Sequence, residues 1–166
     1  MMRRSRGQLL LVDDDLSVRR LLAEALRLEG YDVDVAGDVD EGWQAIERRR
    51  PDVVILDVMM PGGDGLHLLR RVRGTAELRD LTVVLLSARA QPEDLRRGQQ
   101  AGADLYVTKP FTIEQLVWHL DEAMHAPVER PVDPLERFRH NGPLSMDALM
   151  DRVASTPARL PMIVGR

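Results

Sequence analysis

The side chains that could do chemistry in this chain follow short aliphatic runs. The stretch "VVILDVMMPGGDGL" ends such a run in Asp57, and "LLLVDDD" ends another in Asp13 and Asp14. Two later runs lead to a hydroxyl at Ser87 and to an ammonium at Lys109. If the runs end side by side, three carboxylates, a hydroxyl and an ammonium form one candidate site.

Clustered carboxylates of this kind require positive charge. Without it they repel one another and take up protons. A hard divalent cation meets the requirement, and Mg²⁺ commonly binds one or two carboxylates, waters and substrate phosphate oxygens. The second source of positive charge is Lys109, the single lysine among 23 basic residues. The planar guanidinium of arginine would be a poor substitute for its compact ammonium. Pro110 follows it and allows a cis peptide bond that would aim the lysine inward.

Five aliphatic runs predict the strands that must position these groups. They cover residues 9–12, 33–36, 53–56, 83–86 and 105–107, and they show little polar alternation. Between them, apolar residues recur at helical spacing. The sets are Val18, Leu21, Leu22, Ala25 and Leu26; Trp43, Ala45 and Ile46; Leu66, Leu68, Leu69 and Val72; and Ile113, Leu116, Val117, Leu120 and Met124. The fourth helix has few apolar residues and begins near Pro92.

Strand and helix alternating five times predict one α/β domain over residues 8–126. A parallel sheet needs helices over both faces, and right-handed crossovers make it doubly wound, with five strands and five helices. In such sheets the site lies beyond the carboxyl ends of the strands, where strand order reverses. We therefore expect the three acidic residues, Ser87 and Lys109 to meet in one cleft.

The composition narrows the class of protein. The chain has 166 residues and a formal net charge of -4, which suits one well-packed domain and argues against a nucleic-acid coat or a polybasic membrane anchor. It contains no cysteine, which excludes disulfides and thiolate metal sites. No apolar run approaches the roughly 18 residues of a membrane span, and no signal peptide is recognisable. We therefore expect a cytoplasmic protein that binds neither nucleic acid directly nor a membrane.

Four motifs in this order resemble the receiver domain of two-component response regulators, which has a flavodoxin-like (βα)5 fold. "LLLVDDD" is similar to the family's acidic pair after the first strand, and "VVILDVMMPGGDGL" to its phosphoacceptor strand and loop. "LLSA" is similar to the hydroxyl that ends the fourth strand, and "GADLYVTKPF" to the Lys-Pro segment of the fifth. Each motif closes a predicted strand, and the resemblance extends from Gln8 to His125.

The resemblance implies a role for each acidic residue. Asp57 would be the phosphoacceptor, which receives a phosphoryl group from a phosphohistidine on a sensor histidine kinase or a phosphotransfer protein. Asp14 would bind Mg²⁺ directly and Asp13 through water. Asp57 and the backbone carbonyl of Met59 would complete the protein ligands, and the "PGGDG" that follows would let the loop fold tightly. Such a protein assists its own phosphorylation and dephosphorylation and is not an enzyme with a separate substrate.

The resemblance also implies how a phosphoryl group would act as a signal. Lys109 would pair with Asp57 and then with a phosphoryl oxygen, and Ser87 would donate a hydrogen bond to another. The movement of Ser87 would open space behind the fourth strand, into which Tyr106 would turn. The surface formed by the fourth helix, the fifth strand and the fifth helix would then control a partner or the formation of a homodimer.

Two other α/β functions involve similar strand-end residues. Haloacid-dehalogenase phosphatases also use an aspartate at a strand end, but they require a second acid two residues later, where this chain has Met59. A dinucleotide-binding fold requires G-x-G-x-x-G after its first strand, and "VDDDLS" contains no glycine. Ser87 could instead satisfy a local backbone group. Asp15 and Ser17 are better placed than Asp13 or Asp14 to cap the first helix. The remaining alternative function is a phosphate-independent interaction or scaffolding module built on a receiver fold.

The ends of the chain are predicted to lie outside the receiver domain. Residues 1–7 are expected to be a flexible N-terminus, residues 127–143 a proline-containing linker and residues 144–166 a short tail. Within the tail, "LSMDALMDRVAS" has the spacing of a short amphipathic helix, which would be marginal alone. Trp118 falls off the apolar stripe of the fifth helix, among acidic residues. We therefore predict an interface at Trp118, covered by residues 144–154 or by a second subunit.

Overall fold

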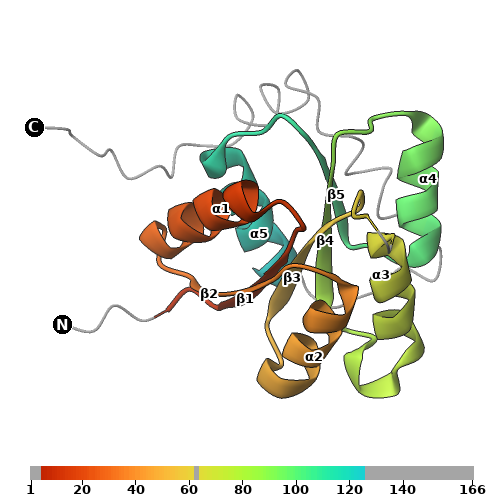
Figure 1. The fold of residues 1–166 in the computed structure, drawn as a ribbon, viewed down its shortest axis with the longest axis horizontal. Helices are drawn as coiled ribbons and strands as arrows, with labels where there is room; N and C mark the ends of the chain where they lie inside the picture. Colours follow the sequence, from red (N-terminus) through yellow and green to blue (C-terminus); the bar gives the residue numbers. More distant parts are fainter. Residues whose placement is uncertain (1–4, 62–63, 126–166) are drawn as a thin grey trace, which may run out of the picture.

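The computed structural model describes residues 5–61 and 64–125, which form a parallel sheet covered by helices on both faces (Figure 1). The elements are β1 (Gln8–Val12), α1 (Leu16–Leu28), β2 (Asp32–Ala36), α2 (Val39–Arg49), β3 (Val53–Asp57), α3 (Gly65–Gly74), the 3₁₀ helix η1 (Ala76–Leu78), β4 (Thr82–Ser87), α4 (Pro92–Ala101), β5 (Leu105–Thr108) and α5 (Ile113–His125). Neighbouring strands are parallel, in the order β2-β1-β3-β4-β5. This topology confirms the predicted doubly wound sheet.

Two apolar clusters, one on each face of the sheet, hold the helices in place. Helices α2, α3 and α4 pack on one face, and α1 and α5 on the other (Figure 1). Successive residues of β3 alternate between the clusters, with Val54 and Leu56 in the first and Val53 and Ile55 in the second. All four are at most 1% exposed. Burial of each such side chain contributes about 1.5–3 kcal/mol, which explains why this strand is apolar throughout.

Side-chain caps mark where the helices begin. Asp15 accepts hydrogen bonds from the backbone N–H groups of Ser17 and Val18, which confirms the expected cap of α1. Asp64 caps α3 by accepting a hydrogen bond from the backbone N–H of Leu66. Pro92 lies in the first turn of α4, where the N–H that proline lacks would have no partner within the helix.

The structure differs from the prediction in the face that α1 buries. Leu21 was expected in the apolar stripe of this helix, and that expectation is wrong, because its side chain is 72% exposed. Leu22, Ala23 and Leu26 form the buried stripe, and Leu21 precedes it by about 100° around the helix axis. Among the described helices, none is long and apolar enough to cross a membrane. The predicted linker and tail, residues 127–166, lie outside the described residues.

Candidate functional site

The candidate site lies at the carboxyl ends of β1 and β3, where strand order reverses. These strands pair with Val12 opposite Leu56, so the residues that follow, Asp13 and Asp57, emerge side by side. One carboxylate oxygen from each of Asp13, Asp14 and Asp57 lies within 4.8 Å of the others. The fold thus brings together the three acidic residues that were expected to share a cleft.

Burial differs among the three carboxylates. Asp13 is 1% exposed and Asp57 7%, whereas Asp14 is exposed. Asp13 Oδ1 accepts a hydrogen bond from the backbone N–H of Asp15 at 2.9 Å, but its buried Oδ2 has no hydrogen-bond partner within residues 5–61 and 64–125. Burial raises the pKa of Asp13, the hydrogen bond from Asp15 opposes this shift, and the charge of Asp57 adds to it. A buried carboxylate oxygen without a donor is a position that a cation would satisfy.

Lys109 places positive charge between two of the carboxylates. Its Nζ lies 3.6 Å from Asp57 Oδ2 and 3.7 Å from Asp13 Oδ2. Its backbone N–H donates to the Ser87 carbonyl at 2.8 Å, and the peptide bond to Pro110 is cis, as the sequence allows. Both side-chain distances are longer than a direct hydrogen bond. The ammonium therefore acts as a point charge shared by two acids, a task that suits lysine better than arginine.

The donor set fits a hard divalent cation. The three carboxylates offer oxygen ligands, which Mg²⁺ prefers. One of these oxygens, Asp13 Oδ2, is buried and has no hydrogen-bond partner among the described residues. A single ammonium balances one of three negative charges, so a divalent ion would neutralise the other two. The Met59 N–H donates to Asp57 Oδ1 at 3.1 Å, which holds this residue's backbone beside the acids while its side chain is 47% exposed. These residues could hold a metal ion.

The sequence matches the response regulator receiver domain over residues 9–121. The chain belongs to this family. Transcriptional regulatory protein TcrX of Mycobacterium tuberculosis is 45% identical to it over 122 residues, which are 72% of this chain and 51% of TcrX. Response regulator MprA of Mycobacterium sp. strain KMS is 40% identical over 133 residues, which are 79% of this chain and 57% of MprA. The chain therefore spans about half the length of these curated relatives.

Solved structures of receivers share the fold. A response regulator from Chloroflexus aurantiacus has a TM-score of 0.69 and 36% identity, with 72% of this chain and 98% of that chain covered. The chemotaxis protein CheY4 of Vibrio cholerae has a TM-score of 0.68 and 31% identity, with 70% of this chain and 98% of the CheY4 chain covered. A signal receiver domain of a histidine kinase from Syntrophus aciditrophicus has a TM-score of 0.68 and 30% identity, with 76% of this chain and 96% of that chain covered. These likenesses confirm the resemblance and the flavodoxin-like fold.

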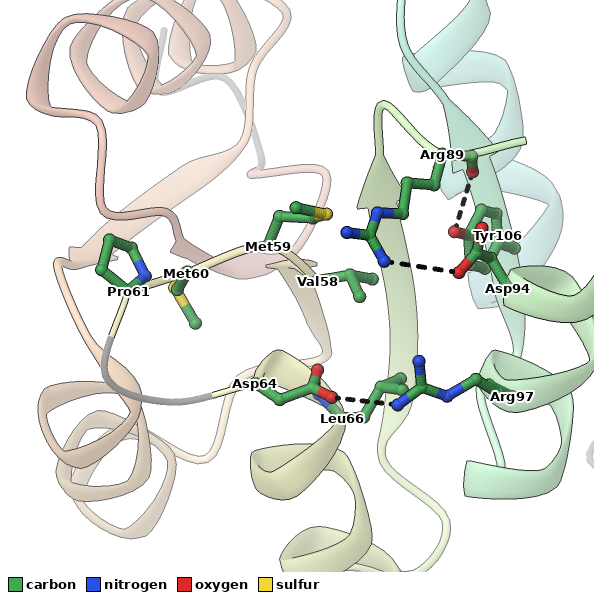
Figure 2. A pocket seen from close by; sticks show the side chains of 10 residues that line it. All are labelled: Val58, Met59, Met60, Pro61, Asp64, Leu66, Arg89, Asp94, Arg97 and Tyr106. Atoms are coloured by element: carbon green, nitrogen blue, oxygen red, sulfur yellow. Dashed lines mark hydrogen bonds and ion pairs between the residues drawn. The ribbon is translucent and has the colours of Figure 1, made fainter. Parts of the chain in front are cut away.

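In this receiver, Ser87 and Tyr106 both contact the loop after β4. Ser87 is 0% exposed, and its Oγ accepts a hydrogen bond from the Arg89 N–H at 3.0 Å, which is the local backbone role that the sequence left open. Tyr106 is 4% exposed, and its hydroxyl donates to the Arg89 carbonyl at 3.0 Å (Figure 2). Burial raises the pKa of Tyr106, and the neighbouring Ser87 hydroxyl works against that shift. The ring therefore lies in the inward position.

A cavity of about 440 Å³ opens between the loop after β3 and helix α4 of the receiver (Figure 2). Tyr106 lines it, and two ion pairs border it. Arg89 Nη1 lies 3.9 Å from Asp94 Oδ1, and Arg97 Nη2 lies 3.8 Å from Asp64 Oδ2. Figure 2 shows that the second pair reaches from α4 to the start of α3. The sequence did not indicate this cavity, because its walls come from separate segments that share no pattern.

Trp118 lies apart from the acidic cleft, on α5. It is partly exposed, and its ring meets the ring of His119 edge-on with 4.7 Å between the centroids. Together with Asp121, Glu122 and His125 it lines a surface hollow of about 460 Å³. The segment predicted to cover it, residues 144–154, lies outside the described residues. The interface at Trp118 therefore stays a prediction.

Proposed function

We propose that this receiver accepts a phosphoryl group on Asp57 from a sensor histidine kinase or a phosphotransfer protein. The observation that carries the proposal is the Asp57 carboxylate itself. It is buried at the end of β3, with Lys109 Nζ 3.6 Å from one of its oxygens and with Asp13 and Asp14 in the same cleft. Phosphoryl transfer needs a positioned nucleophile and fixed positive charge around the phosphoryl oxygens, and this arrangement supplies both.

The proposed transfer forms one bond and breaks another. An oxygen of Asp57 attacks phosphorus and forms an acyl phosphate, while the bond from phosphorus to the donor imidazole breaks and the imidazole keeps the bonding electron pair. Lys109 stabilises the negative charge on the phosphoryl oxygens throughout this step. Hydrolysis by water later releases phosphate and restores the carboxylate. The chain would thus assist its own phosphorylation and dephosphorylation, with no separate turnover substrate.

We further propose that Mg²⁺ binds at the acidic cleft, held by Asp13, Asp14, Asp57 and the backbone carbonyl of Met59. Bound there, the ion would neutralise charge on the phosphoryl oxygens. The unsatisfied buried oxygen of Asp13 supports this assignment, as does the excess of acid over ammonium in the cleft. Asp14 is the exposed member of the set and suits direct contact with a hydrated ion arriving from solvent.

The output of the receiver is part of the same proposal. Phosphorylation of Asp57 would draw the Ser87 hydroxyl toward the phosphoryl group and act through Tyr106 on the surface of α4, β5 and α5, which would control a partner or a homodimer. A kinase that uses ATP would place this chemistry in the cytoplasm. The lack of direct nucleic-acid binding stays a prediction, since TcrX is described as a transcriptional regulatory protein and this chain matches 51% of it.

A chemical assay tests the phosphoacceptor. The purified chain with Mg²⁺ and acetyl phosphate should gain one hydroxylamine-labile acyl phosphate, detected by intact mass. Asp57→Asn should abolish the signal. The matched control is Asp32→Asn, which removes an exposed carboxylate from the first residue of β2, at the opposite edge of the sheet, and should keep the full signal. Undiminished labelling of Asp57→Asn would refute the assignment.

A second measurement separates the receiver from the scaffolding alternative. Beryllium fluoride with Mg²⁺ imitates an aspartyl phosphate, so it should raise the melting temperature of the wild-type chain and leave that of Asp57→Asn unchanged. An unchanged melting temperature in both proteins would favour a phosphate-independent interaction module.

A further inference from the structure

The ring of Tyr106 lies directly against the backbone of α4 at Gly98. A Cβ atom at position 98 would lie 2.9 Å from Tyr106 Cδ2, 3.2 Å from Tyr106 Cε2 and 3.1 Å from Leu85 Cδ1. Real Cβ atoms essentially never come within 3.0 Å of such neighbours. Leu85 is 0% exposed and Tyr106 4%, and Tyr106 also borders the cavity between the loop after β3 and α4. A side chain at position 98 therefore requires the Tyr106 ring, Leu85 or the helix to shift.

The backbone conformation at position 98 does not require glycine. The glycines with positive φ in the described residues are Gly7, Gly30 and Gly102, and Gly102 with φ 92° is the C-cap of α4. Gly98 lies inside α4 with ordinary helical geometry, where alanine would favour the helix more than glycine does. The close approach of the Tyr106 ring is the reason that the structure offers for the missing side chain.

Contacts with α3 and with the core fix the helix that covers the ring. The C-terminal end of α4 is tied to α3, because the Gly102 carbonyl accepts a hydrogen bond from Arg73 Nε at 2.8 Å. Leu95 and Ala101 anchor the same face of the helix in the core. The hydroxyl of Tyr106 donates one hydrogen bond, to the loop after β4. The ring also borders the cavity beside α4, so it has space into which it can move.

We propose that Gly98 sets the position of Tyr106. Glycine allows α4 to close over the ring and hold it inward, and a larger residue turns the ring outward, away from the Arg89 carbonyl. The backbone of Arg89 binds both Tyr106 and the Ser87 hydroxyl, so the ring position reaches the loop beside the acidic cleft. This last link rests on the proposed function of Asp57. If an inward ring favours phosphorylation, a residue that drives the ring out must weaken the binding of a phosphoryl mimic. The free energy lost in binding equals the free energy by which phosphorylation favours the inward ring.

Fluorine NMR of the chain labelled with 3-fluorotyrosine tests the ring position directly. The chain has two tyrosines, so Tyr31, on the opposite face of the sheet, serves as an internal reference and Tyr106→Phe assigns the signals. Gly98→Ala should move the Tyr106 signal and increase its shift between H₂O and D₂O, which reports exposure to solvent. Gly74→Ala is the matched control, because nothing lies within 4 Å of a Cβ at that position. An unchanged solvent shift in folded Gly98→Ala would overturn the proposal.

A second variant decides the case in which Gly98→Ala folds poorly. In a Tyr106→Ala background the ring is gone, so adding Gly98→Ala should raise the melting temperature, although the same substitution lowers it in the wild-type chain. A lowered melting temperature in both backgrounds would show that another contact requires the glycine and would overturn the proposal. Titration with beryllium fluoride and Mg²⁺ should show weaker binding to Gly98→Ala. If the wild-type chain does not respond to the mimic, the phosphoacceptor assignment fails, while the ring measurement still decides the role of Gly98.

Discussion

Gly65, the first residue of α3, approaches the end of β3 more closely than a side chain allows. A Cβ atom at position 65 would lie 2.3 Å from the backbone carbonyl oxygen of Asp57 and 3.2 Å from Leu56 Cγ. Gly65→Ala must therefore separate the Cβ and this oxygen by about 0.7 Å, the difference between 2.3 Å and the 3.0 Å limit of real Cβ contacts. The oxygen belongs to the backbone, so the start of α3 or the end of β3 has to move.

We expect Gly65→Ala to slow phosphorylation by acetyl phosphate roughly 10- to 100-fold, because a displacement near 1 Å at a reacting group costs up to about 10²-fold in rate. Overpacking of this kind also lowers the free energy of unfolding by about 1–3 kcal/mol. A typical domain has about 5–15 kcal/mol of stability, so the variant should remain folded. The assay is a time course of hydroxylamine-labile phosphate with saturating Mg²⁺, together with urea unfolding of the same samples.

Gly74→Ala is the control for this prediction, because it makes the same substitution at the other end of the same helix, with nothing within 4 Å of the new Cβ. Its rate of phosphorylation should equal that of the wild-type chain. Rates are to be compared at equal folded fraction, so that lost stability is not counted as lost chemistry. If folded Gly65→Ala were phosphorylated at the wild-type rate, the close approach would not position Asp57, and the reasoning would be wrong.

Three further predictions concern other parts of the chain. Lys109→Arg should keep Mg²⁺ binding but lose most of the response to beryllium fluoride in a partner-binding or dimerisation assay, because the guanidinium cannot replace the ammonium; an equal response would contradict this. Burial and a hydrogen bond to a carboxylate raise the pKa of Tyr31 above its ordinary 10.0, so the native state binds more protons above that pH and loses stability as the pH rises. Urea unfolding should show the advantage of the wild-type chain over Tyr31→Phe shrinking above pH 10.0; a constant difference would count against it. Truncation after Pro127 should red-shift Trp118 fluorescence, measured with Trp43→Phe, or shift the monomer-dimer balance. If truncation causes neither change, the tail does not cover Trp118.

The sequence alone determined the class of fold and the members of the acidic cleft. Continuous aliphatic runs between helical patterns predicted a parallel sheet, and parallel strands end at one edge. Asp13 and Asp57 could therefore be placed together without coordinates, since strand ends of a doubly wound sheet converge where strand order reverses. Lys109 could be added because it also follows a strand and is the single lysine of the chain. These inferences need connectivity and periodicity and no knowledge of distances.

Only the tertiary structure decided the features that depend on ångström-scale packing. The unsatisfied oxygen of Asp13, the inward ring of Tyr106 and the close approaches at Gly65 and Gly98 arise where separate segments meet. The exposure of Leu21 belongs with them, because the face that a helix buries depends on how it lies on the sheet. Local sequence carries periodicity, whereas these contacts depend on the positions of α3, α4 and the loops relative to one another, which many weak interactions set together.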